Sequence, residues 1–205
     1  MALLTQDETS LIEQAIARVE SRSATELVVA VVERSDDYHL PRVLVTFGWT
    51  LALSLIAVFF VPALPPWWVV AAELPLAFLL FALFGLPGIH RRLLPRQTVE
   101  RAVQERAYAV FAERGLHRTR QRTGLLIMLS ELEHRVVILG DSGIHALVGD
   151  AGWRDYVGRI VRGIREGRAA AGVLEAIAEL EPLLATHAPR QSDDENELAD
   201  AVVRG

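Results

Sequence analysis

Residues 43–61 read VLVTFGWTLALSLIAVFFV, and residues 67–89 read WWVVAAELPLAFLLFALFGLPGI. The first run has no charged residue, and the second has only Glu73. At a rise of about 1.5 Å per residue, each helix is close to the thickness of a bilayer's hydrocarbon core, about 30 Å. We therefore expect a hairpin of two transmembrane helices within residues 42–90. The alternative is a pair of soluble helices buried in a core.

The charges that flank these runs predict an orientation. Residues 62–66, which join the two helices, carry no charge. Arginines lie on the outer side of both helices, and arginine is enriched in cytoplasmic segments of membrane proteins. They are Arg34, Arg42, Arg91, Arg92 and Arg96. This pattern predicts that both soluble segments face the cytoplasm and that the joint lies outside.

Glu73 stands alone inside the second apolar run. Intramembrane carboxylates are rare and commonly functional. The alternative is a side chain that reaches the nearer interface through backbone loosened at Pro75. We keep both interpretations open.

The soluble segments predict an α/β domain. Thr5 and Glu8 have the spacing of a capping box, and a helix with apolar residues at helical spacing follows to about Glu20. Further helices are expected over residues 98–114, from Ile144, over 152–165 and over 169–187. Continuous apolar runs at residues 27–32, 125–129 and 136–139 are typical of buried strands.

The order of these elements predicts a domain that the membrane hairpin interrupts. The last two strands are too close in sequence for a helical crossover, so we expect them to be antiparallel. The first strand cannot be stable alone and must join them in a small mixed sheet with helices on both faces. The predicted parts are residues 1–41 and 91–190 of one domain, the hairpin at 42–90, and a solvated or loosely docked acidic tail at 191–205.

Composition excludes several classes of site. The 205 residues include no cysteine, so disulfides and thiolate metal sites are excluded, and the net charge of −5 gives no indication of nucleic-acid binding. Phosphate-binding loops, dinucleotide-binding glycine motifs and paired zinc-ligand histidines are also absent from the sequence. We therefore assign no catalytic residue and leave open whether the chain is an enzyme.

Three carboxylates that follow predicted strands are candidate metal ligands. Asp36 and Asp37 come after the strand at 27–32, and Asp141 comes after the strand at 136–139. Carboxylate oxygens are the ligands that Ca²⁺ prefers, and a convergence at one sheet edge would form a site. The alternative is that Asp36–Asp37 forms a turn and that Asp141 caps a helix.

Several short motifs of the soluble part resemble those of the bacterial TPM-domain membrane proteins. The matching segments are Leu4-Thr5, Ala24-Thr25-Glu26, Asp36-Asp37-Tyr38, residues 123–130, Glu133, residues 135–141, Gly143-Ile144, Trp153, and Asn196-Glu197-Leu198 with Asp200. The resemblance implies an α/β/α sandwich around a small mixed sheet. Relatives are described as weak acid phosphatases, as calcium binders and as accessory subunits of membrane assemblies.

From the residues and this resemblance together, we expect a membrane-anchored TPM-like binding or accessory module. It would bind a divalent cation such as Ca²⁺ and serve another membrane protein or complex. The alternative is a weak, metal-assisted acid phosphatase. The expected location is the bacterial inner membrane, crossed twice, with the soluble domain in the cytoplasm.

Overall fold

A computed structural model of the chain describes residues 3–61, 63, 65–190 and 202–204. Its contacts divide the chain into two compact units. The α/β unit comprises Met1–Ser35 and Arg101–Gly205, and the hairpin unit comprises Asp36–Glu100. Each unit is described by itself below.

The α/β unit is built on a mixed sheet with the strand order β3-β2-β1-β4. β1 (Glu26–Val32) pairs in parallel with β2 (Gly124–Ser130), from Glu26 opposite Gly124 to Val32 opposite Ser130. β3 (Arg135–Gly140) is antiparallel to β2. The mixed sheet and the antiparallel pair that the sequence predicts are therefore confirmed.

A fourth strand that the sequence analysis missed completes the sheet. β4 (Val203–Arg204) pairs in parallel with β1, with Ala30 opposite Val203. These two residues belong to the segment predicted as a solvated or loosely docked tail. The acidic residues of that prediction lie within 191–201, outside the described residues.

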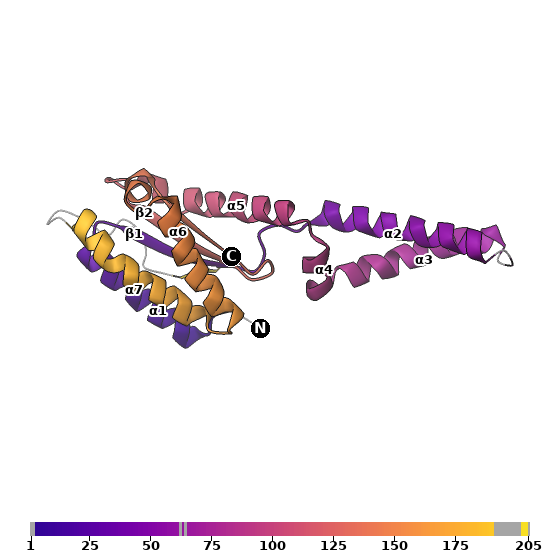
Figure 1. Ribbon diagram of the computed structural model, residues 1–205, viewed down its shortest axis with the longest axis horizontal. Helices are drawn as coiled ribbons and strands as arrows, with labels where there is room; N and C mark the ends of the chain where they lie inside the picture. The colour runs from indigo at the N-terminus through magenta and orange to yellow at the C-terminus, as the bar shows by residue number, and fades with distance from the viewer. Residues whose placement is uncertain (1–2, 62, 64, 191–201, 205) are drawn as a thin grey trace. The chain divides into compact units, whose positions relative to one another are not determined.

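Helices cover both faces of the sheet, which explains why β1 and β2 are buried along their whole length (Figure 1). On one face, Val29 and Ile127 share a core with α1 (Gln6–Arg22), α6 (Ser142–Arg165) and α7 (Ala169–His187). On the other face, Ala30 and Met128 have no exposed surface. α5 (Arg96–Glu113) runs along the sheet in Figure 1, and Val103, Ala107 and Val110 of this helix are buried.

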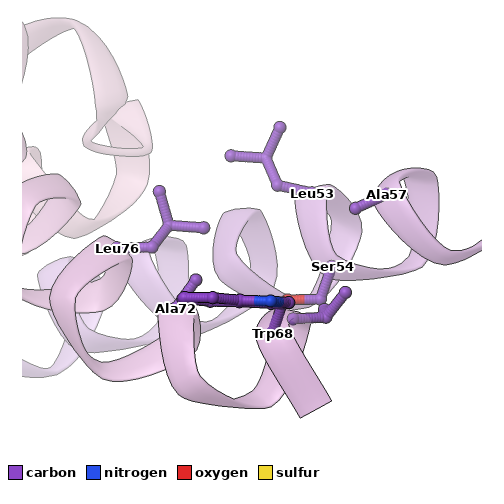
Figure 2. Close-up of a pocket in the computed structure, with 7 residues that line it drawn as sticks. Leu53, Ser54, Ala57, Trp68, Ala72 and Leu76 are labelled. Atoms are coloured by element: carbon purple, nitrogen blue, oxygen red, sulfur yellow. The ribbon is translucent and has the colours of Figure 1, made fainter. Parts of the chain in front are cut away.

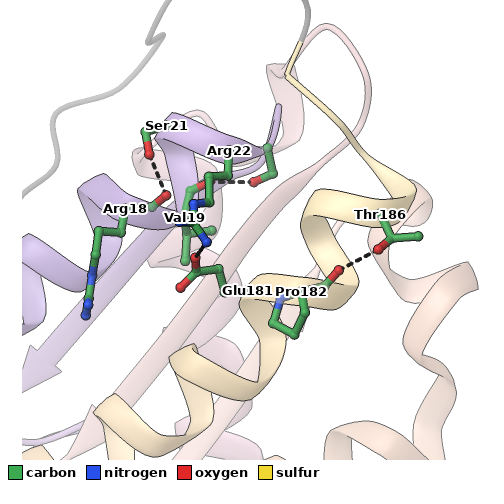
Figure 3. Close-up of polar contacts among 8 residues, drawn as sticks. Arg18, Val19, Ser21, Arg22, Glu181, Pro182 and Thr186 are labelled. Carbon is green, nitrogen blue, oxygen red and sulfur yellow. Dashed lines mark hydrogen bonds and ion pairs between the residues drawn. The ribbon is translucent and has the colours of Figure 1, made fainter.

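Polar contacts join the end of α1 to α7 (Figure 3). The guanidinium of Arg22 lies 2.8 Å from the carboxylate of Glu181. The hydroxyl of Ser23, the C-cap residue of α1, donates to the carbonyl of Val19 at 2.9 Å. The ion pair links α1 to α7, and the hydroxyl of Ser23 adds a second hydrogen bond to a carbonyl that already accepts the Ser23 backbone N–H at 2.9 Å.

α6 consists of two helical segments that meet at a non-helical residue, in agreement with the two helices predicted from Ile144 and over residues 152–165. It runs from Ser142 to Arg165, with a kink at Gly149, whose φ of 67° lies in the left-handed region. Glycine adopts this conformation without the steric cost that a side chain brings. A short 3₁₀ helix, η1 (Leu116–Arg118), leads from α5 towards β2.

The hairpin unit contains α2 (His39–Phe60), α3 (Pro66–Phe84) and α4 (Pro87–Leu93). The second apolar run was predicted as one helix to Ile89, but α3 ends at Phe84. Pro87 has no backbone N–H to continue a helix, whereas proline fits the first turn of a new one. α2 and α3 are long and apolar enough to cross a membrane.

Candidate functional site

The carboxyl edge of the parallel strands carries a compact polar network. The Ser130 hydroxyl, at the end of β2, donates to the Glu133 carboxylate. Ser35, just beyond β1, donates its backbone N–H to the same carboxylate at 2.9 Å, and its hydroxyl lies 2.9 Å from that of Ser130. The network ties the chain after β1 to the turn after β2.

Burial limits what this network can do chemically. Ser130 has 0% and Glu133 has 6% of its surface exposed. A hydroxyl beside a carboxylate is the start of a nucleophile–base pair, but a substrate would have to reach the hydroxyl oxygen. Since Ser130 is enclosed, we interpret the network as structural. Glu133 was among the motif residues, but no pattern in the sequence indicated that it would contact Ser35.

Asp36 and Asp37 form a turn at the beginning of the hairpin unit. Asp36 Oδ1 accepts the backbone N–H of Tyr38 at 3.3 Å, which is the hydrogen bond of an Asx turn. The side chain of Asp37 is 61% exposed, and its Oδ2 lies 3.7 Å from His39 Nε2. The turn that we considered as the alternative to a metal site is therefore present.

Asp141 is the N-cap of α6. Its Oδ1 accepts the backbone N–H of Ser142 at 2.6 Å, and its own N–H donates to the Gly124 carbonyl at 2.8 Å. Its buried Oδ2 has no hydrogen-bond partner among the described residues; Arg122 Nη1 lies 4.0 Å away. This position too matches the structural alternative.

Strand direction separates the three predicted metal ligands. Because β3 is antiparallel to β2, its carboxyl end lies beside Gly124, where β2 and β1 begin. Asp36 directly follows Ser35, which is bonded to residues at the opposite edge. Seven residues of β2, about 23 Å of extended chain, separate the two edges. The three carboxylates therefore do not fit one cation site.

The described residues contain no group of three or more histidine, aspartate or glutamate side chains arranged to hold a metal ion. Calcium binding, for which the sequence analysis named Asp36, Asp37 and Asp141, stays a prediction from the sequence.

Two buried acidic residues lie near the amino end of β1. The sequence analysis did not predict that they would be close together. Glu26, the first residue of β1, is 7% exposed, and Glu20 near the end of α1 is 8% exposed. Glu20 Oε1 accepts the backbone N–H of Leu27 at 3.0 Å, and its backbone carbonyl accepts from Arg190 at 2.9 Å. The bonds of Glu20 connect α1 to the strand that follows it.

In the hairpin unit, two grooves run between α2 and α3. One, of about 400 Å³, is lined by Thr46 and Thr50 of α2 and by Glu73 of α3, among apolar neighbours. The other, of about 360 Å³, is lined by Ser54 and otherwise by apolar and aromatic residues, including Trp68 and Leu76 (Figure 2). Of the two, the first contains Glu73, the carboxylate within the second apolar run that the sequence analysis singled out.

Comparisons with known proteins support the fold. The family model of the TPM domain matches residues 93–182. An NMR structure of the BA42 protein from the psychrophilic bacterium Bizionia argentinensis is similar, with a TM-score of 0.62 and 20% identity over 100% of this chain and 97% of that one. At this identity, the likeness shows the fold alone. No curated protein matches the chain. The predicted resemblance is thus confirmed for the TPM domain and its α/β fold.

Proposed function

We propose that this chain is a two-pass membrane protein whose hairpin anchors a TPM-like α/β domain as a binding or accessory module of a membrane complex. The observation that carries the proposal is the surface of α2 and α3. Large apolar side chains on both helices are mostly exposed, for example Phe59 at 76%, Phe60 at 79%, Leu74 at 82% and Phe78 at 77%.

Such a surface is unfavourable in water. Soluble proteins rarely expose contiguous apolar patches larger than a few hundred Å². Buried core helices have most of their surface covered, whereas only 11% of the apolar window of each of these helices is buried. A bilayer accounts for both the length of the helices and the direction in which their apolar side chains point.

Among the described residues, the polar groups at the strand ends and at the start of the hairpin unit give no specific support to catalysis. Ser130 is buried within its network, Asp36 belongs to a turn, and Asp141 caps a helix. None of these positions combines an accessible nucleophile with a base or a group of metal ligands. The alternative of a metal-assisted acid phosphatase gains no specific support from them.

The proposed location is the bacterial inner membrane, with the α/β domain in the cytoplasm. The support is the arginine on the outer flanks of the helices and its absence from residues 62–66. We expect the protein to stay in the membrane pellet after an alkaline carbonate wash. Release into the supernatant would contradict membrane insertion.

Cysteine labelling tests the orientation. Because the sequence has no native cysteine, only the introduced cysteine can react with the reagent. A cysteine placed at Ala63 should react with a membrane-impermeant reagent from outside. A reporter fused after Gly205 should score as cytoplasmic. The reverse pattern would overturn the orientation while leaving membrane insertion intact.

A further inference from the structure

We propose that the groove containing Glu73, Thr46 and Thr50 binds a transmembrane helix of a partner protein through a lysine or arginine side chain. This inference rests on the proposed membrane insertion of the hairpin. It specifies where the partner binds and the chemistry that recognises it.

The groove combines an apolar lining with one carboxylate. Val43, Phe47 and Leu74 are among the apolar residues that line it together with Glu73. Glu73 lies seven residues beyond Pro66, where α3 begins, which places it about 10 Å along the helix axis. An ionised carboxylate at that depth is costly unless it is paired.

The apolar part of the hairpin, residues 43–89, has no residue of opposite charge to pair with Glu73. Between Val43 and Ile89 the sequence has no lysine, arginine or histidine. Arg42, at the start of α2, contacts the C-terminal end of α3. It donates to the Phe81 carbonyl at 2.6 and 3.0 Å and lies 3.7 Å from the centre of the Phe81 ring.

Thr46 and Thr50, which are 6% and 9% exposed, contribute hydrogen-bond acceptors to the lining of the groove. The Thr46 hydroxyl donates to the Arg42 carbonyl at 2.8 Å, and the Thr50 hydroxyl donates to the Thr46 carbonyl at 2.9 Å. Each hydroxyl has a single hydrogen, so its oxygen is left with acceptor capacity only. Together with the carboxylate of Glu73, the groove therefore complements a side chain that carries positive charge and several donors.

This complementarity selects the occupant. A lipid tail or a purely apolar helix would leave the carboxylate without a donor. A second copy of this hairpin would bring another glutamate and no cation from the same depth. A partner helix with lysine or arginine near the same depth satisfies both the apolar lining and the acceptors.

The test uses the full-length chain with a donor dye on a cysteine added after Gly205, reconstituted in phosphatidylcholine vesicles. The probe is an acceptor-labelled peptide of about 22 leucine and alanine residues with one lysine about 10 Å from one interface. We expect energy transfer to show binding about tenfold tighter than that of the same peptide with leucine in place of lysine.

Variants assign this preference to the groove. Glu73→Gln should abolish the preference for lysine, and Glu73→Asp should retain most of it. Leu76→Gln is the matched control, since it introduces the same amide into the other groove of the hairpin. We expect this control to leave the preference unchanged.

Two results would overturn the inference. Equal binding of the lysine and leucine peptides would show that no cation is recognised. Self-association of the labelled chain that Glu73→Gln abolishes, and that the lysine peptide cannot displace, would assign the groove to a second copy. Failure of the unmodified chain to resist carbonate extraction from the vesicles would instead contradict the proposed membrane insertion.

Discussion

Gly124 marks a close approach of two backbone segments at the start of β2. A Cβ at this position would lie 2.1 Å from the carbonyl oxygen of Leu116, so the backbone would have to move. We expect Gly124→Ala to lower the free energy of unfolding by about 1–3 kcal/mol, as overpacking in a well-packed core does. Thermal or urea unfolding in detergent measures the change.

Gly158 provides the matched control for that substitution. It lies within α6, and an added Cβ would meet no atom within 4 Å. Alanine loses less conformational freedom than glycine in a helix, so Gly158→Ala should stabilise the protein by about 0.5–1 kcal/mol. Equal effects of the two substitutions would contradict the close approach at Gly124.

The separation of the candidate metal ligands leads to a prediction about calcium. Of the three candidates, Asp36 and Asp37 are adjacent in the sequence, and two such ligands give a weak site. We expect millimolar Ca²⁺ to stabilise the protein by about 1 kcal/mol or less. Replacing Asp36 and Asp37 together by asparagine should remove this effect, whereas Asp141→Asn should leave it unchanged.

Melting curves with and without Ca²⁺ measure both effects. Asp141→Asn should also change the stability without calcium little, because asparagine caps a helix about as well as aspartate. Loss of the calcium effect in Asp141→Asn alone would restore Asp141 as a ligand.

Among the helices, α1 has the clearest local start signal, which is a capping box formed by Thr5 and Glu8. The Glu8 N–H donates to the Thr5 hydroxyl at 3.3 Å, and Glu8 Oε2 accepts from the Thr5 N–H and hydroxyl, each at 2.8 Å. The hydrogen bonds from the Thr5 backbone and then from its hydroxyl lower the pKa of the Glu8 carboxyl below its ordinary value. The charged form of Glu8 is therefore the one that the fold favours.

The sign of this pKa shift gives the pH dependence. A carboxyl with a lowered pKa in the folded state stabilises the protein above its ordinary pKa, and the effect fades as the pH falls through the lowered value. Comparing Glu8→Gln with the unmodified protein, we expect a difference in Tm at pH 7 that shrinks towards zero at acid pH. A difference that is constant with pH would contradict an ionic role for Glu8.

Thr5→Ala tests the other half of the capping box. It should cost about 1 kcal/mol at pH 7, since the helix loses its side-chain cap. Thr9→Ala in the first turn is the control. The Thr9 hydroxyl donates to the Thr5 carbonyl at 2.8 Å, but Thr9 does not contribute the cap. A cost as large for Thr9→Ala would show that the cap is not the cause.

At the scale of the whole molecule, the pairing of the sheet lies entirely within the α/β unit. β1 comes before the hairpin, and β2, β3 and β4 come after it. We expect that replacing residues 42–91 by a short Gly/Ser linker leaves a soluble, folded protein, because no strand and no residue of α5 is removed. Circular dichroism and a cooperative melt would report the fold.

The length of the linker is the control in that experiment. A flexible linker costs little extra entropy as it lengthens, so several lengths should succeed. Aggregation at every length would contradict a sheet that folds without the hairpin.

The sequence by itself determined the local elements. The positions of the apolar helices, of the continuous strands and of the capping box at Thr5 follow from length, periodicity and residue type, which act over a few turns of chain. The antiparallel pairing of β2 with β3 was also predictable, because a short connection leaves no room for a crossover.

Only the tertiary structure decided which groups meet. Val203 pairs with Ala30 although the two are far apart in the sequence. Ser35 contacts Ser130 and Glu133, although the hairpin sequence lies between them. The direction of β1 relative to β2 also cannot be predicted from the residue pattern of each strand. Had β1 run antiparallel to β2, Asp36 and Asp141 would follow strands that end at the same edge. With β1 parallel to β2, they lie at opposite edges, because direction depends on how distant segments pair and not on the residues within each strand.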